Sequence, residues 1–137
     1  MKSLHNIQES LEEIRNAYEA YKDAKIAKRR ICAPMLTDYD TLPNLWQLFC
    51  DTIGKQDGGG TIDKQKFIFI VQYLYAPTNL FGEKMPRLLR HELTKITGIK
   101  SGSVITRYCR NSLFYYNNYA NFHADTNRIF AEIMKNL

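Results

Sequence analysis

Apolar side chains recur at alternating intervals of three and four residues through the first part of the chain. They are Leu4, Ile7, Leu11, Ile14, Tyr18 and Tyr21. Because this spacing places them on one face, it predicts an amphipathic helix over residues 1–30. Such a face pairs with a second copy of the chain in a coiled coil, or it packs against the chain's own domain. The flanking positions offer no complementary charges that would fix a partner, so both arrangements remain open.

A second helix is predicted after Pro34 and the turn-rich stretch 37–41 interrupt this pattern. Thr41 followed by Pro43 is typical of an N-cap and a first-turn proline. The helix then runs to about Gly54, with one apolar face. That face consists of Leu45, Trp46, Leu48, Phe49 and Ile53, and Cys50 is expected there as a small buried side chain.

Three consecutive glycines at positions 58–60 follow this helix. A phosphate-binding loop would need a strand before the glycines and Gly-Lys-Ser/Thr at its end. Here a predicted helix precedes them and Thr61-Ile62-Asp63 follows them. The glycines are therefore predicted to form a flexible connector.

The segment 64–76 is almost continuously apolar and reads KQKFIFIVQYLYA. An apolar run of this kind suits either a buried strand or a buried helix. Its length, an Asp63 cap before it and Pro77 after it favour a helix, and the chain has no second strand-like run for it to pair with. We therefore expect an all-α fold of about five or six helices, with a helical domain over residues 31–137 built around this segment.

The composition agrees with one globular domain and excludes several other classes. The chain has 137 residues, of which 45% are hydrophobic and 24% are charged. No apolar run approaches the roughly 20 residues that span a bilayer. Cys32, Cys50 and Cys109 are too widely spaced for a disulfide framework or a zinc knuckle, which favours a reducing compartment. The first residues are amphipathic and acidic, unlike a secretion signal, so a cytoplasmic protein with no membrane partner is expected.

The net charge of +5 has an uneven distribution. The predicted N-terminal helix ends in a basic run of Lys25, Lys28, Arg29 and Arg30. Segment 79–118 holds seven basic residues, opposed only by Glu83 and Glu92. A helical surface needs some charge for solubility alone. The clustering nevertheless favours a polyanionic partner.

Segment 86–118 has the pattern of two helices joined by a glycine turn. Its apolar positions are Leu93 and Ile96 in the first helix and Val104 and Ile105 in the second. Gly98 can take the left-handed conformation that ends a helix, and Ile99 can point inward to set the angle between the helices. Ser101 or Ser103 then caps the second helix through its hydroxyl group.

The second helix of this pair divides into an apolar and a polar face. The apolar positions are Ile105, Cys109, Leu113 and Tyr116, and the polar ones are Ser103, Thr106, Arg107, Arg110, Asn111 and Asn117. Arginine donates two hydrogen bonds to guanine, asparagine pairs with adenine, and hydroxyl groups hold phosphates. Lys95 and Lys100 flank the turn and, with Arg87 and Arg90, are placed to contact phosphates. The predicted DNA-binding residues are Lys95, Lys100, Ser101, Ser103, Thr106, Arg107, Arg110 and Asn111.

This arrangement resembles the helix-turn-helix units of DNA-binding proteins. The stretch RYCRNSLFYYNNY, followed by another helix, is similar to small helix-turn-helix proteins of phages and mobile elements. The resemblance implies double-stranded DNA as the partner and a regulator or accessory protein as the role. In a dimer joined by the N-terminal helices, two such units would read half-sites about 34 Å apart. The turn is slightly longer than usual, and Thr94 or Thr97 stands where alanine is frequent, which leaves the register of the pair open.

An enzyme is not expected from this sequence. His5, His91 and His123 are far apart and form no metal-binding motif with a carboxylate. No nucleophile stands next to a base in a known pattern. No cofactor, metal or small-molecule substrate is therefore expected. The alternative to DNA binding is a non-enzymatic helical module for protein–protein interaction or virion assembly, whose basic face meets an acidic protein surface.

Aromatic residues are frequent after the polar face of the second helix. They are Phe114, Tyr115, Tyr116, Tyr119 and Phe122. Aromatic rings can hold single-stranded nucleic acid by stacking on its bases. Their helical spacing instead predicts that most of them pack in the core against Ile129, Phe130, Ile133 and Met134 of a last helix.

Overall fold

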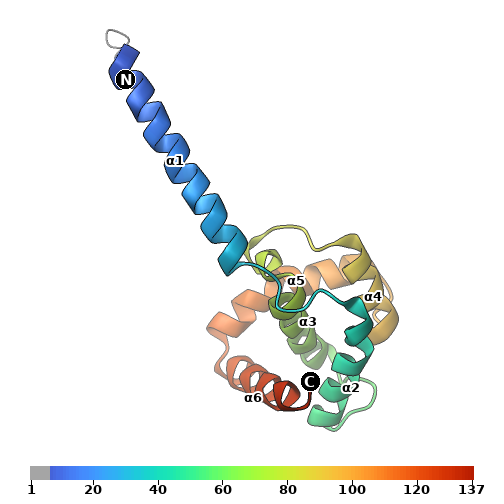
Figure 1. Cartoon of the computed structure of the whole chain (residues 1–137). Coiled ribbons are helices and arrows are strands. Elements are labelled where there is room, and N and C mark those ends of the chain that lie inside the picture. Colours follow the sequence, from blue (N-terminus) through green and yellow to red (C-terminus); the bar gives the residue numbers. More distant parts are fainter. Residues whose placement is uncertain (1–6) are drawn as a thin grey trace. The chain divides into compact units, whose positions relative to one another are not determined.

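The computed structural model describes residues 7–137, and this part of the chain is helical without strands (Figure 1). This confirms the predicted all-α fold. Its six α-helices are α1 (Ile7–Ile31), α2 (Leu42–Ile53), α3 (Thr61–Tyr75), α4 (Arg87–Thr97), α5 (Gly102–Asn118) and α6 (Ala120–Asn136), and two short 3-10 helices are η1 (Tyr39–Thr41) and η2 (Pro77–Phe81). The chain divides into two compact units, Met1–Ala33 and Pro34–Leu137. None of the helices in the described part has both the length and the apolar character needed to span a bilayer.

Helix α1 makes up the described part of the first unit. Its apolar stripe is open to solvent, since Leu11 and Ile14 are 59% and 52% exposed and Tyr18 and Tyr21 are each 61% exposed. Leu4, which the same pattern includes, lies outside the described residues. Glu9 in the first turn and the basic residues in the last turn both suit the helix dipole.

Helix α3 is the centre of the second unit, as predicted. It packs against α5, α6 and η2. Its fully buried apolar side chains are Phe67, Ile68, Ile70, Val71 and Leu74. The prediction that Asp63 is the N-cap was wrong: the N-cap is Gly60, and Asp63 lies in the first turn. The Asp63 carboxylate accepts a hydrogen bond from the backbone N–H of Gly60 at 3.2 Å, so it satisfies a free donor from inside the helix.

The N-terminus of α2 also differs from the prediction in its chemistry. Thr41 precedes the helix, but its side chain makes no capping hydrogen bond. The Thr41 hydroxyl instead donates to the backbone oxygen of Asp38 at 2.7 Å and contacts the hydroxyl of Tyr75. The contact with Tyr75 ties η1 to the end of α3. This tertiary partner competes with the helix end for the hydroxyl group, so Thr41 does not cap α2.

The glycine segment is more closely packed than a flexible connector. Gly58 is buried and has a φ angle of +85°, in the left-handed region. A Cβ atom at this position would lie 2.0 Å from the ring of Trp46. Glycine is therefore required at position 58 by both the backbone conformation and the lack of space.

The aromatic residues near the α5–α6 junction depart from the predicted core packing. Phe122 is buried, whereas Phe114 is 56% and Tyr119 is 52% exposed. The rings of Tyr115 and Tyr119 lie 5.3 Å apart, and Tyr116 stacks on Phe69 of α3. The prediction therefore failed for Phe114 and Tyr119. Phe114 lies within α5 on the same outer side as Arg107 and Arg110, and Tyr119 lies where the chain leaves the helical conformation between α5 and α6.

Candidate nucleic-acid interface

The connection between α4 and α5 has the local structure expected from its sequence. Gly98 ends α4 in the left-handed conformation, with a φ angle of +71°. Ile99 points inward and is 8% exposed. Ser101 is the N-cap of α5, and its hydroxyl oxygen accepts a hydrogen bond from the backbone N–H of Val104 at 3.4 Å. Ser101, and not Ser103, is thus the capping residue.

The exposed face of α5 carries the two arginines of the predicted site. Arg107 and Arg110 are exposed, while Ile105 and Cys109 on the opposite side are buried. The guanidinium group of Arg107 lies over the ring of Tyr108, 5.8 Å from its centroid. The inward and outward sides of α5 therefore agree with the prediction at these positions.

The other predicted contact residues differ in how accessible they are. Ser103 and Lys100 are exposed, whereas Thr106 and Asn111 are half-buried. The ammonium group of Lys95 lies 3.4 Å from a carboxylate oxygen of Glu92, a surface ion pair that water and salt weaken. The serines at positions 101 and 103 are hydrogen-bonding distance apart, with 3.0 Å between their Oγ atoms.

Arg90 of α4, expected from the sequence only as a phosphate contact, lies against α5. It is half-buried, and its Nη1 donates to Oγ1 of Thr106 at 3.5 Å. A Cβ atom on Gly102 would lie 3.1 Å from Nε of Arg90, so glycine at the start of α5 leaves room for this side chain. The three-residue spacing of Arg87 and Arg90 was visible in the sequence, but their position beside α5 was not.

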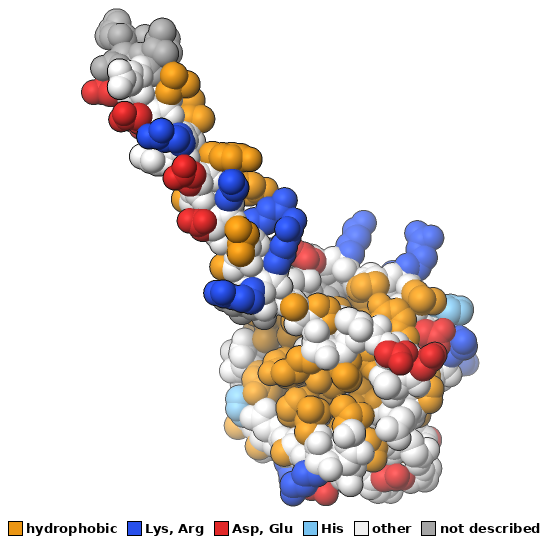
Figure 2. Space-filling model, viewed as in Figure 1, with side chains coloured by type: hydrophobic (Ala, Val, Ile, Leu, Met, Phe, Trp, Pro, Cys, Tyr) orange, Lys and Arg blue, Asp and Glu red, His pale blue; other side chains and the backbone are white. Residues whose placement is uncertain are grey.

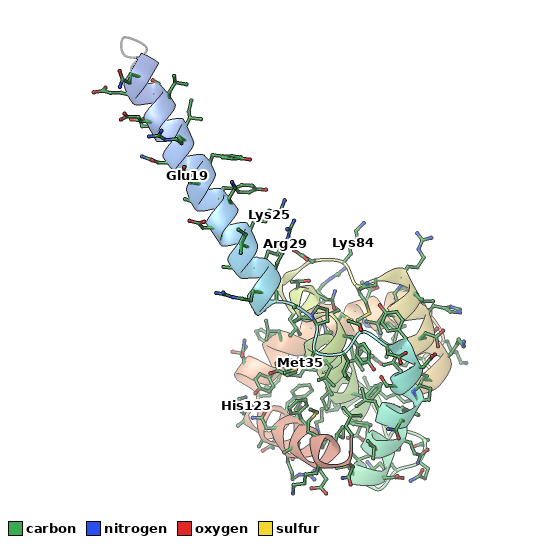
Figure 3. The ribbon with its side chains drawn as sticks, viewed as in Figure 1. Glu19, Lys25, Arg29, Met35, Lys84 and His123 are labelled. Carbon is green, nitrogen blue, oxygen red and sulfur yellow. The ribbon has the colours of Figure 1, made fainter. Side chains whose placement is uncertain are left out.

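The arginines of this face have no acidic partners. Within residues 7–137, no carboxylate lies within 4.0 Å of the guanidinium groups of Arg87, Arg90, Arg107 or Arg110. Lys84, labelled in Figure 3, projects outward from the loop before α4. The face therefore carries positive charge that is not neutralised by the described part of the chain.

Two adjoining hollows open on this face. The deeper one has a volume of about 570 Å³ and lies between α5, α4 and the loop after η2. The shallower one has a volume of about 390 Å³. It is lined by Gly102, Ser103 and Arg107 and by three residues that it shares with the deeper one. Arg90, Thr106 and Arg110 line both hollows. Lys84 and Arg87 line only the deeper one.

Cys109 at the base of the deeper hollow is not a reactive thiolate. Burial raises the pKa of its thiol to about 12, and the nearby positive charge of Arg90 offsets only part of this shift. The thiol is therefore protonated at neutral pH, and it contributes apolar surface.

The chain was compared with protein-family models, curated proteins and solved structures. None of them matches it. The function of the α4–α5 face therefore has to be inferred from its own geometry and charge.

Proposed function

We propose that α4 and α5 bind double-stranded DNA as a helix-turn-helix unit, with α5 in the major groove. The observation that carries the proposal is the pair Arg107 and Arg110, which are exposed on one side of α5 and form no ion pair with a carboxylate of residues 7–137. An α-helix fits the major groove, and arginine reads guanine there through two hydrogen bonds. The capped start of α5 at Ser101 supports this role, because it holds the helix that carries both arginines.

Most of the remaining polar residues of the face are assigned to phosphate contacts that position α5 on the duplex. Lys95, Lys100 and Ser103 lie near the turn and contact phosphates, and Arg87 and Arg90 do so from α4. Asn111 is the second base-reading candidate beside the arginines. Binding alone accounts for this role, and the proposal includes no catalytic step. A cytoplasmic regulator or accessory protein of a phage or mobile element agrees with it.

The proposal is tested by measuring duplex affinity at two salt concentrations. If four cations contact phosphates, a fourfold rise in salt lowers the affinity by roughly 100-fold, because condensed counterions are released on binding. A gel-shift titration with a random-sequence duplex measures this slope, and selection from a random pool then shows sequence preference. Duplex binding no tighter than binding to heparin would contradict the proposal and favour the protein-interaction alternative.

A second part of the proposal concerns α1, which we infer pairs with α1 of a second copy. Its stripe exposes Leu11, Ile14, Tyr18 and Tyr21, and a helix in a protein owes most of its stability to the packing of such an apolar face. Figure 2 shows hydrophobic side chains, in orange, along α1. Pairing two such stripes buries them in the manner of a coiled coil.

The charges of α1 favour an antiparallel pair. Residues 7–18 contain three acidic residues and one basic residue, whereas residues 19–31 contain two acidic and five basic residues. Glu19, Lys25 and Arg29 of the second half are labelled in Figure 3. Antiparallel pairing sets the acidic half of each helix beside the basic half of the other.

Dimerisation through α1 is measured by sedimentation equilibrium without DNA. The double variant Leu11→Glu/Ile14→Glu is expected to raise the dimer dissociation constant by at least about 100-fold, because each copy loses two buried apolar side chains. Asn16→Glu on the outer face of the helix is the control. Added salt should weaken the antiparallel pair, since it screens the attraction. A pair that tightens with salt would be parallel, and a monomer at all concentrations would indicate that α1 does not self-associate.

A further inference from the structure

The deeper hollow beside α5 has the size and construction of a ligand site. Its volume of about 570 Å³ lies within the usual range for small-molecule pockets. Its walls come from three separate segments: the loop after η2, α4 and α5. One wall is held in place by Asn79, whose amide nitrogen donates to the backbone oxygen of Glu83 at 2.7 Å and whose amide oxygen accepts from Gln72 at 2.7 Å.

The rim of this hollow is suited to a phosphate group. Lys84, Arg87, Arg90 and Arg110 line it, and Glu83 is the acidic residue among the lining side chains. The guanidinium group matches phosphate oxygens with two parallel hydrogen bonds. Arg90 is preorganised for this contact, because Thr106 accepts one of its N–H groups and its side chain lies against Gly102.

The floor of the hollow is apolar. Ile105 is fully buried beneath it, Cys109 is 6% exposed, and Met85 packs against the core at its edge. Inorganic phosphate would use only the charged rim. A phosphate carried on a flat, partly apolar group would use both the rim and the floor.

We propose that this hollow binds a nucleotide, with the phosphate between Arg87, Arg90 and Arg110 and the base against Met85. The same chemistry is offered by a free nucleotide and by the phosphorylated end of a nucleic-acid strand. The proposal needs only one nucleotide, so it does not depend on DNA reading by α5.

The ligand chemistry is tested by isothermal titration calorimetry with the full chain. Adenosine 5′-monophosphate is expected to bind at least about tenfold more tightly than adenosine or inorganic phosphate, because each of these lacks one half of the recognised group. Equal affinities for the three probes would overturn the proposal. A short oligonucleotide with a 5′-phosphate identifies the source: a strand end is indicated if it binds more tightly than adenosine 5′-monophosphate, and a free nucleotide if it binds more weakly.

Substitutions locate the site and separate it from DNA binding. Arg87→Gln removes a cation that lines only the deeper hollow, and it is expected to lower the affinity for adenosine 5′-monophosphate by about tenfold. Arg128→Gln, which removes an exposed arginine from α6, is the matched control and should leave this affinity within about twofold. An unchanged affinity in Arg87→Gln would overturn the proposal.

Arg107→Gln distinguishes failure of this proposal from failure of the proposed DNA binding. Arg107 lines the shallower hollow but not the deeper one. Its substitution should therefore lower duplex affinity and leave nucleotide affinity unchanged. Nucleotide binding without duplex binding would contradict only the helix-turn-helix role, and the reverse result would contradict only the nucleotide site.

Discussion

Exchanging both Arg107 and Arg110 for glutamine is expected to lower the affinity for a preferred duplex by at least about 30-fold. Each base-reading arginine contributes about 1 to 3 kcal/mol, so the loss of both costs at least about 2 kcal/mol. Both side chains are exposed, and Arg107 contacts only the ring of Tyr108 among the described residues. The fold should therefore tolerate the change, and the loss reports on binding.

This prediction is checked by competition binding with preferred and random duplexes. The arginine variant should lose the difference between the two duplexes, because base contacts carry sequence information. Lys100→Gln should weaken both duplexes equally, since a phosphate contact does not depend on sequence. Arg128→Gln on α6 is the matched control. Retained preference in the double variant would show that α5 does not read bases.

Replacing Gln72 by alanine is expected to lower the free energy of unfolding by about 2 to 4 kcal/mol. Gln72 is fully buried in α3. Its amide nitrogen donates to Asn79 at 2.7 Å and to the backbone oxygen of Cys109 at 3.1 Å, and its amide oxygen accepts from the Ser112 hydroxyl at 2.6 Å. Alanine would remove these three hydrogen bonds, would leave the amide oxygen of Asn79 without this donor, and would also leave a cavity.

Urea unfolding followed by circular dichroism measures this loss. Gln72→Met separates its two causes, because methionine fills most of the space without making the hydrogen bonds. Gln47→Ala on the exposed side of α2 is the matched control, and it should cost less than about 1 kcal/mol. Equal stability of the alanine variant and the unchanged chain would show that this network does not hold α3 and α5 together.

The burial of α3 was predictable from the sequence, but the hydrogen-bond partners of Gln72 were not. The apolar run around α3 correctly indicated a buried helix, since nearly every side of it is covered by other helices. Gln72 interrupts that run as a polar residue, and nothing local indicates which groups it contacts. Its partners Asn79, Cys109 and Ser112 come from two other segments, so only the packing of those segments reveals them.

The candidate DNA-binding face was likewise predictable from the sequence only in part. Local chemistry was sufficient for the left-handed Gly98, a serine cap at position 101 or 103 and the outward direction of Arg107 and Arg110, because each depends on helix geometry and neighbouring residues. The hollow beside α5 was not predictable. It forms where α4 and the loop after η2 meet α5, and no sequence spacing relates these surfaces.

Helix type, helix ends and the inward side of α5 thus follow from short-range interactions. These interactions act between residues a few positions apart, so the local sequence determines them. The contact of the Thr41 hydroxyl with Tyr75, the close packing of Gly58 on Trp46 and the exposure of Phe114 and Tyr119 depended on tertiary structure. The physical reason is competition: a side chain takes the partner that packing brings to it, and for these residues that partner, or its absence, is decided by segments distant in the chain.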